Sequence, residues 1–201
     1  PDVSSAASDV YKRQGSIYSC GNIIKWLRDK MKFFENSKDS EDFLRKDGNS
    51  NNVLFLPAFN GLGAPYWNSE IRGGFYGITQ DTSIEDMTTA AFQSVAFQTK
   101  VITNIISLYD IKIQKLLVDG GMVSNKTFCQ VLADTLQIEI VKPKNVESTA
   151  IGACKIAMLS SGMSIENLSK NEISYKVNKD RRDVYFRNYS KWQEYLLNTI
   201  K

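Results

Sequence analysis

The sequence predicts an α/β domain in which helices cover a mixed or parallel sheet. Short apolar runs of strand length alternate with segments whose apolar residues recur at helical spacing. The 201 residues are 42% hydrophobic and 23% charged, as in ordinary globular domains. A domain of this size buries about 70% of the surface that its unfolded chain exposes, so we expect a core that needs neither metal nor disulfides.

The N-terminal part is expected to hold a tail, a strand end, a helix and a buried strand. Residues 1–14 are polar and lack any helical or strand period, so we expect a foreign or disordered tail outside a domain at 15–201. Residues 15–18 are typical of a strand end, and 22–34 carry apolar residues at helical spacing. The apolar run at 53–57 predicts a buried strand that ends at proline.

The middle of the chain predicts a glycine-dense loop and then the longest helix. Residues 60–77 contain five glycines, which permit positive backbone torsions and close approach of the chain to itself. We expect a structured loop plus a strand there. Either Thr82 or Ser83 can cap the next helix, from about residue 84 to 108, whose first turn carries two acidic residues favoured by the helix dipole.

The C-terminal half continues the alternation of strands and helices. Residues 116–118 predict a buried strand that ends in the turn Asp119-Gly120-Gly121, after which Ser124 caps a helix at 125–136. The remaining expected elements are a strand at 138–141, a turn at Pro143, a helix at 148–160 and an aromatic-rich docking helix at 185–200.

Charge and composition argue against several classes of function. The net charge of +3 is spread over interleaved acidic and basic residues, so no stripe fit for nucleic acid is expected. The cluster Lys179, Arg181 and Arg182 is typical of a solvated loop. The chain has no histidine, which removes the usual metal ligand and hydrolase base.

Three cysteines, Cys20, Cys129 and Cys154, lack the spacing of a zinc site, so we expect reduced core residues and no metal ligands. No apolar run reaches the roughly 18 residues that span a bilayer, and no signal-peptide pattern opens the sequence. A cytoplasmic protein is therefore expected.

The strongest chemical motif is VDGGMVSN at 118–125. Two glycines after a strand let backbone N–H groups face a ligand, and the next helix adds its positive N-terminal end, which suits a phosphate or a nucleotide. Two adjacent glycines after a strand are also common in plain tight turns, so the motif by itself leaves both interpretations open.

Several blocks resemble one enzyme family. The string PAFNGLGAPYW at 57–67 resembles the signature of glycerol kinases, and residues 72–93 resemble the C-terminal signature of the wider FGGY family of carbohydrate kinases. GSIYSCGNIIKWLRD at 15–29, VDGGMVSN, and NVESTAIGAC at 145–154 are similar to further blocks in the same order. The resemblance runs from Gly15 to at least Gly162.

The resemblance implies a ribonuclease-H-like fold of the actin, Hsp70 and sugar-kinase superfamily, with a mixed sheet flanked by helices. It implies the C-terminal ATP/ADP-binding lobe of an enzyme that transfers the γ-phosphoryl group of ATP to glycerol with Mg²⁺. The catalytic base, the Mg²⁺ ligands and the glycerol pocket are expected in an N-terminal lobe absent from this chain. Alone, the chain should be inactive and bind nucleotide weakly. Homo-oligomer formation is left open.

Four residues carry over as nucleotide contacts. They are Gly21, Lys25, Gly121 and Asn125, and Lys25 stands where glycerol kinases commonly place glutamine. Lysine can attract a phosphate oxygen, but a solvent-facing lysine on an amphipathic helix is an equal alternative. Asp119 is expected to orient its turn by accepting backbone N–H bonds rather than to act as a base.

Other interpretations stay open. The aromatic residues Trp26, Tyr66, Trp67 and Trp192 could stack on a base or sugar, although core or interface packing is expected of them. A xylulose or gluconate kinase of the same family, or a non-catalytic actin-like nucleotide-binding module, are the alternative functions. A nuclease would need converging carboxylates to hold two metal ions, and Asp119 has no such partners nearby in the sequence.

Overall fold

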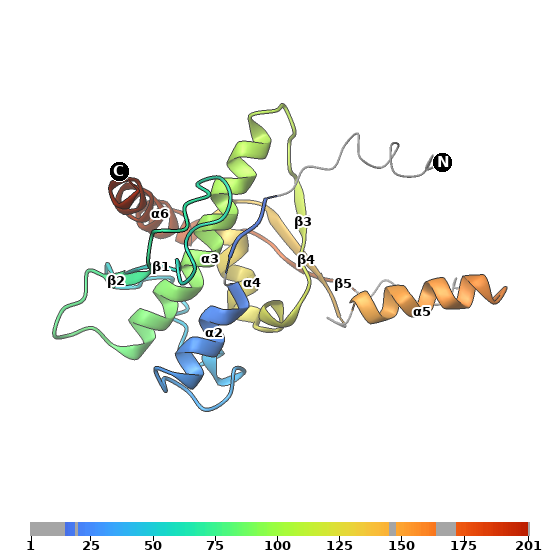
Figure 1. Ribbon diagram of the computed structural model, residues 1–201, viewed down its shortest axis with the longest axis horizontal. Coiled ribbons are helices and arrows are strands. Elements are labelled where there is room, and N and C mark those ends of the chain that lie inside the picture. Colours follow the sequence, from blue (N-terminus) through green and yellow to red (C-terminus); the bar gives the residue numbers. More distant parts are fainter. Residues whose placement is uncertain (1–14, 19, 145–147, 164–171, 201) are drawn as a thin grey trace.

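The computed structural model describes residues 15–18, 20–144, 148–163 and 172–200, so the expectation for residues 1–14 lies outside it. Two small sheets flank a long helix (Figure 1). In the first sheet, β1 (Leu54–Leu56) pairs antiparallel with β2 (Gly74–Tyr76). In the second, β3 (Lys115–Leu117) runs parallel to β4 (Glu139–Pro143), and β5 (Glu172–Tyr175) pairs antiparallel with β4. The predicted mixed sheet is confirmed for this second group of strands.

The long helix α3 (Ile84–Ser107) organises the core between the two sheets. Of the two predicted caps, Thr82 and Ser83, Ser83 is the one used: its Oγ accepts the Asp86 amide at 3.2 Å while Asp86 Oδ2 accepts the Ser83 amide at 3.0 Å. The helix packs against β1 on one side and against α4 (Lys126–Leu136) on the other. Apolar side chains along both contacts are buried, and they include Phe92, Ala96 and Phe97.

The C-terminal helix α6 (Arg182–Thr199) docks onto this core as predicted. Its inner face buries Tyr185, Tyr189, Trp192 and Leu196. The Trp192 indole Nε1 donates a hydrogen bond of 2.9 Å to the Phe55 carbonyl of β1, so the helix is anchored by a satisfied buried polar group as well as by apolar area.

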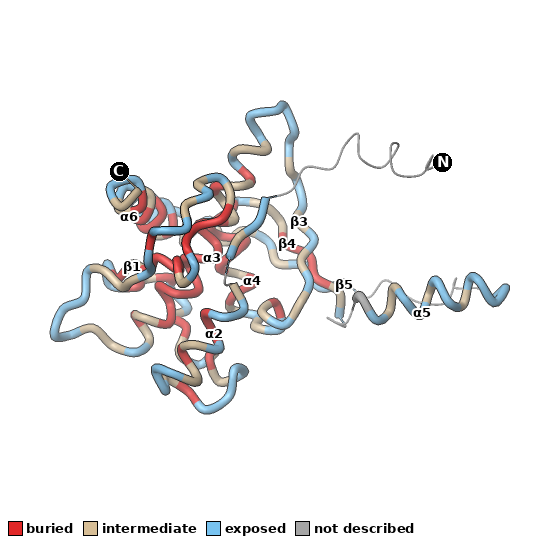
Figure 2. The backbone as a smooth tube through the Cα atoms, in the orientation of Figure 1, coloured by how far each residue is buried: buried red, intermediate tan, exposed pale blue. Residues whose placement is uncertain are grey.

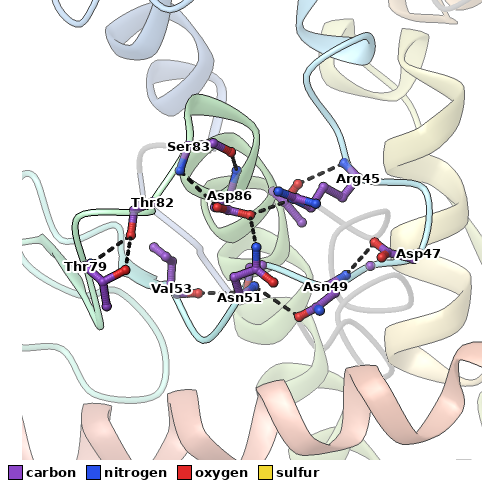
Figure 3. A network of polar contacts seen from close by, with 12 residues as sticks. Arg45, Asp47, Asn49, Asn51, Val53, Thr79, Thr82, Ser83 and Asp86 are labelled. Atoms are coloured by element: carbon purple, nitrogen blue, oxygen red, sulfur yellow. Dashed lines mark hydrogen bonds and ion pairs between the residues drawn. The ribbon is translucent and has the colours of Figure 1, made fainter.

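A buried carboxylate ties the loop at 42–53 to the start of α3 (Figure 3). Asp86 is fully buried; its Oδ1 lies 2.6 Å from Arg45 Nε and accepts a bond of 2.9 Å from Asn51 Nδ2. The Arg45 amide also donates to Thr89 Oγ1 at 3.0 Å. The loop is therefore fixed in place although it contains no helix or strand, and it carries the preceding short 3₁₀ turn η1 (Asp39–Glu41) with it.

The first helix begins and ends earlier than predicted. Helix α2 spans Cys20–Asp29 instead of 22–34, because Lys32 takes a left-handed torsion, with φ of 58°, and turns the chain away. Residues 15–18 do not form the predicted strand end. The Ser16 carbonyl instead accepts a bond of 2.9 Å from the Ala64 amide in the glycine-dense loop.

The predicted turn at Pro143 is wrong, because Pro143 is the last residue of β4 and opposes Glu172. In the cluster at 179–182, Lys179 and Arg182 are exposed as predicted, but the segment is not a loop. Residues Lys179–Arg181 form the 3₁₀ turn η3 that leads into α6, and Arg181 Nη1 lies 3.7 Å from the buried carboxylate of Asp134. That cluster therefore helps to hold α6 on α4.

The helix α5 (Ser148–Ser160) has the predicted bounds but lies away from the rest of the described chain (Figures 1 and 2). Its Ile156 is 70% exposed, and Leu117 on the edge strand β3 is also 70% exposed, so the expectation of a buried strand at 116–118 is wrong. Cys154 on α5 is exposed rather than in the core, whereas Cys129 is buried and Cys20 half-buried, and all three are free thiols.

Three of the four aromatic residues pack as expected. Trp192 is buried, Trp26 lies against the rings of Phe55, Phe59 and Phe75, and Tyr66 is partly buried against the apolar cluster under α6. Trp67 differs, since it is 65% exposed. Among the described residues, none of the helices combines the length and the apolar character that crossing a bilayer requires.

Candidate functional site

A cavity of about 610 Å³ lies between α2, η1 and the turn before α4. All four residues predicted to contact a nucleotide, Gly21, Lys25, Gly121 and Asn125, line this cavity. They come from two segments about 100 residues apart in the sequence, which the fold brings to opposite walls. The volume lies in the range of pockets that hold small molecules and cofactors.

The α2 wall is an amphipathic helix that presents Gly21, Ile24, Lys25 and Arg28 to the cavity. Ile23 and Leu27 are fully buried against the core, which turns Gly21 and Lys25 outward, one helical turn apart. A Cβ placed on Gly21 would meet no protein atom within 4 Å, so packing does not require a glycine there. The bare backbone leaves room that a ligand can fill.

The opposite wall is the glycine turn after β3. Gly120 has φ of 102°, a torsion that favours glycine, and the chain then forms one 3₁₀ turn, η2 (Gly121–Ser124), before α4 begins. The helix cap is Asn125, one residue later than the predicted Ser124, because the 3₁₀ turn occupies residues 121–124. The Asn125 Oδ1 accepts the Phe128 amide at 2.9 Å, and the side-chain NH₂ group of Asn125 has two N–H donors, of which the bond to Ser40 uses one.

The third wall is η1, which the sequence analysis did not identify. Glu41 Oε1 accepts bonds of 3.3 Å from both the amide and the hydroxyl of Thr127, in the first turn of α4. Asn125 Nδ2 donates to Ser40 Oγ at 3.4 Å. A carboxylate at a helix N-terminus is favourable, and here it joins two segments 86 residues apart. No local sequence pattern signals such a long-range contact.

Cations dominate the rim of the cavity. Arg28 is neutralised locally, since its Nε lies 2.6 Å from Asp29 Oδ1 and its Nη1 donates to Ser37 Oγ at 2.9 Å. Lys25 and Lys38 also line the cavity, and neither takes part in an ion pair within the described part of the chain. The rim therefore offers positive charge to an anionic ligand.

One expected absence, that of metal ligands, and the expected role of Asp119 concern chemistry at this site. Within residues 15–18, 20–144, 148–163 and 172–200, no group of three or more His, Cys, Asp or Glu residues could hold a metal ion. Asp119 is exposed, and none of the hydrogen bonds among the described residues uses its carboxylate, so the expected turn-orienting bonds are not formed.

Comparisons with known proteins agree on one family. The model of the C-terminal domain of the FGGY family of carbohydrate kinases matches residues 3–161. Glycerol kinases from Streptococcus pneumoniae strains Hungary19A-6 and CGSP14 are each 38% identical over 189 residues, which is 90% of this chain. The chain spans 38% of the length of these curated relatives.

Solved structures show the same similarity. The crystal structure of Plasmodium falciparum glycerol kinase with ADP has a TM-score of 0.78 and 29% identity, covering 92% of this chain and 38% of that one. A gluconate kinase from Lactobacillus acidophilus has a TM-score of 0.76 at 21% identity, covering 92% of this chain and 39% of that one. At that identity, the second likeness concerns the fold alone.

Proposed function

This chain belongs to the FGGY family of carbohydrate kinases and has their ribonuclease-H-like fold, and from that premise we propose that it is the nucleotide-binding lobe of a glycerol kinase. The proposed reaction transfers the γ-phosphoryl group of ATP to a hydroxyl group of glycerol. The single observation that carries the proposal is the meeting of Gly21, Lys25, Gly121 and Asn125 around one cavity. A relative of similar fold was crystallised with ADP.

Each of the four residues has a proposed role. Gly21 and Gly121 let the backbone approach the nucleotide without a side chain in between. Lys25 attracts a phosphate oxygen, and the Asn125 amide nitrogen donates to a polar edge of the nucleotide. Phosphoryl transfer depends mainly on positioning and charge stabilisation, so a rigid nucleotide wall is a direct contribution to it.

Metal binding, proton abstraction and glycerol binding are not assigned to the residues of this cavity. Mg²⁺ would supply positive charge to the nucleotide phosphates, and the described residues offer no carboxylate cluster to hold it. We assign the Mg²⁺ ligands, the catalytic base and the glycerol pocket to the part of the kinase outside the segment that this chain matches. Glycerol is favoured over xylulose or gluconate by the 38% identity to glycerol kinases and by the string at 57–67.

The test fills the cavity without disturbing the fold. Gly21→Leu and Gly121→Leu each add a side chain where no protein atom lies within 4 Å of a Cβ, so the chain should fold normally by circular dichroism. Calorimetry should show ADP affinity at least about tenfold weaker than in the unsubstituted chain, equivalent to about 1.4 kcal/mol. The matched control is Gly152→Leu on α5, where a Cβ also meets open space.

Two results would contradict the proposal. One is an unsubstituted chain that shows no ADP binding, and the other is unchanged affinity in both cavity variants. A kinase carrying this lobe, assayed with glycerol, xylulose and gluconate in parallel, tests the substrate separately.

A further inference from the structure

Lys142 of β4 is a buried cation directly behind the glycine turn. It is only 5% exposed, and its Nζ donates a hydrogen bond of 2.5 Å to the carbonyl of Val123 in η2. Within the described part of the chain, none of the ion pairs includes Lys142. Because a buried ammonium group is costly unless it is hydrogen-bonded, the bond to Val123 is the main compensation that the fold provides.

The same carbonyl is held from a second direction. The Cys129 Sγ of α4 donates to the Val123 carbonyl at 3.3 Å. Burial raises the pKa of the Cys129 thiol to about 11, so the thiol stays protonated and remains a donor at neutral pH. Lys142 Nζ also lies over the ring of Tyr175 on β5, 5.8 Å from the ring centroid, which adds a cation–π contact to the ammonium group.

These contacts act on the wall of the cavity. Val123 is buried, whereas the other residues of η2, Gly121, Met122 and Ser124, line the cavity. Holding the Val123 carbonyl from β4 and α4 at once fixes how far η2 stands from Gly21 on the opposite wall. A preorganised wall binds its ligand better than a mobile one, because less order has to be created on binding.

We propose that Lys142, supported by Cys129, is a positioning residue for the nucleotide: it holds the glycine turn at the spacing from α2 that the nucleotide requires. This inference rests on the proposed function of the cavity. Lys142 does not line the cavity itself, so it acts through the turn and not by contact with the ligand.

The test compares Lys142→Met, Lys142→Arg and the unsubstituted chain, each with all 201 residues. Calorimetry with ADP should show about tenfold weaker binding for the methionine variant and recovery to within about threefold for arginine, which keeps the charge and the donor. The backbone amide signals of Gly121 and Ser124 in ¹H–¹⁵N spectra should shift in the methionine variant and return in the arginine variant.

The matched control is Lys100→Met. Lys100 is a half-buried lysine of α3 that also donates to a backbone carbonyl, that of Thr135 at 2.6 Å, near the C-terminal end of α4. It does not line the cavity. Its replacement should leave ADP affinity unchanged. If the Lys100→Met and Lys142→Met variants lost ADP affinity equally, Lys142 would contribute only to the general stability of the fold, and the inference would be overturned.

The outcomes separate this inference from the function on which it rests. If the unsubstituted chain binds no ADP, the proposed function fails and the inference fails with it. If the unsubstituted chain binds ADP and Lys142→Met binds it equally well, only the inference is overturned. If Lys142→Met does not fold, Cys129→Ala takes its place, because it removes the second hydrogen bond to the Val123 carbonyl. Unchanged ADP affinity and unchanged Gly121 amide signals in the Cys129 variant would then overturn the inference.

Discussion

Replacing Asp86 with alanine removes the carboxylate that anchors the loop at 42–53 to α3 (Figure 3). The lost contacts are the Ser83 amide at 3.0 Å, Asn51 Nδ2 at 2.9 Å and Arg45 Nε at 2.6 Å. A helix cap contributes about 1 kcal/mol, and a hydrogen bond to a charged group about 1.5–3 kcal/mol. Because the Arg45 side chain stays 35% exposed, its ion pair adds little beyond this, and we expect the free energy of unfolding to fall by about 2.5–4 kcal/mol.

Urea unfolding at pH 7, followed by circular dichroism, measures this loss. The control is Asp81→Ala, an exposed carboxylate in the loop before the same helix, which should change the free energy of unfolding by less than about 0.5 kcal/mol. Because the loop also carries η1, ADP affinity should fall in the Asp86 variant. A loss of stability below about 1 kcal/mol would refute the reasoning, since it would mean that the buried contacts contribute no more than one neutral hydrogen bond.

Three further predictions follow from the same contacts. Burial acts to raise the pKa of Asp86, but the surrounding hydrogen bonds outweigh it and hold the pKa below its ordinary value. The stability that Asp86 provides is therefore present at neutral pH and is lost as the pH falls from the ordinary aspartate pKa of about 3.9 through the lower folded-state pKa, so the difference in urea midpoint between the unsubstituted chain and Asp86→Asn should narrow over that fall in pH. Glu41→Gln should weaken ADP binding about threefold by calorimetry, because the bond that fixes η1 on the N-terminus of α4 loses its charge. Iodoacetamide should label exposed Cys154 first and Cys129, whose pKa burial raises to about 11, only on unfolding, and mass spectrometry that finds equal rates would contradict the packing of α4.

Local patterns were sufficient to place most helices and strands. The cap Ser83, the bounds of α5 and the docking helix α6 all follow from signals within a few residues of each other. The end of α2 could not be predicted from local signals, because the helical spacing of apolar residues continues to Phe34, whereas the backbone of Lys32 already has a left-handed torsion. Phe34 is buried all the same, so the pattern correctly marked a core residue but not its helix.

The pattern of apolar residues also does not predict which part of the protein covers a given apolar side chain. Leu117 and Cys154 were both predicted to be buried, yet Leu117 is 70% exposed and Cys154 is exposed in the described chain. Burial depends on a partner surface, and periodicity reports only the preference of a segment for one. The third wall of the cavity was missed for a similar reason, since the contact of Glu41 with Thr127 joins residues 86 apart.

The glycines in the family-like segments and the glycines at the candidate site are surrounded differently. A Cβ on Gly63, in the glycerol-kinase-like string, would lie 2.3 Å from the Ser16 carbonyl oxygen, and one on Gly73 would lie 2.4 Å from that of Leu56. These glycines are required by the close approach of the chain to itself. Gly21 and Gly121 face open space at the cavity, so folding alone does not explain them. The most recognisable string therefore reports how the loop packs, and the less distinctive glycines are the ones whose replacement tests nucleotide binding.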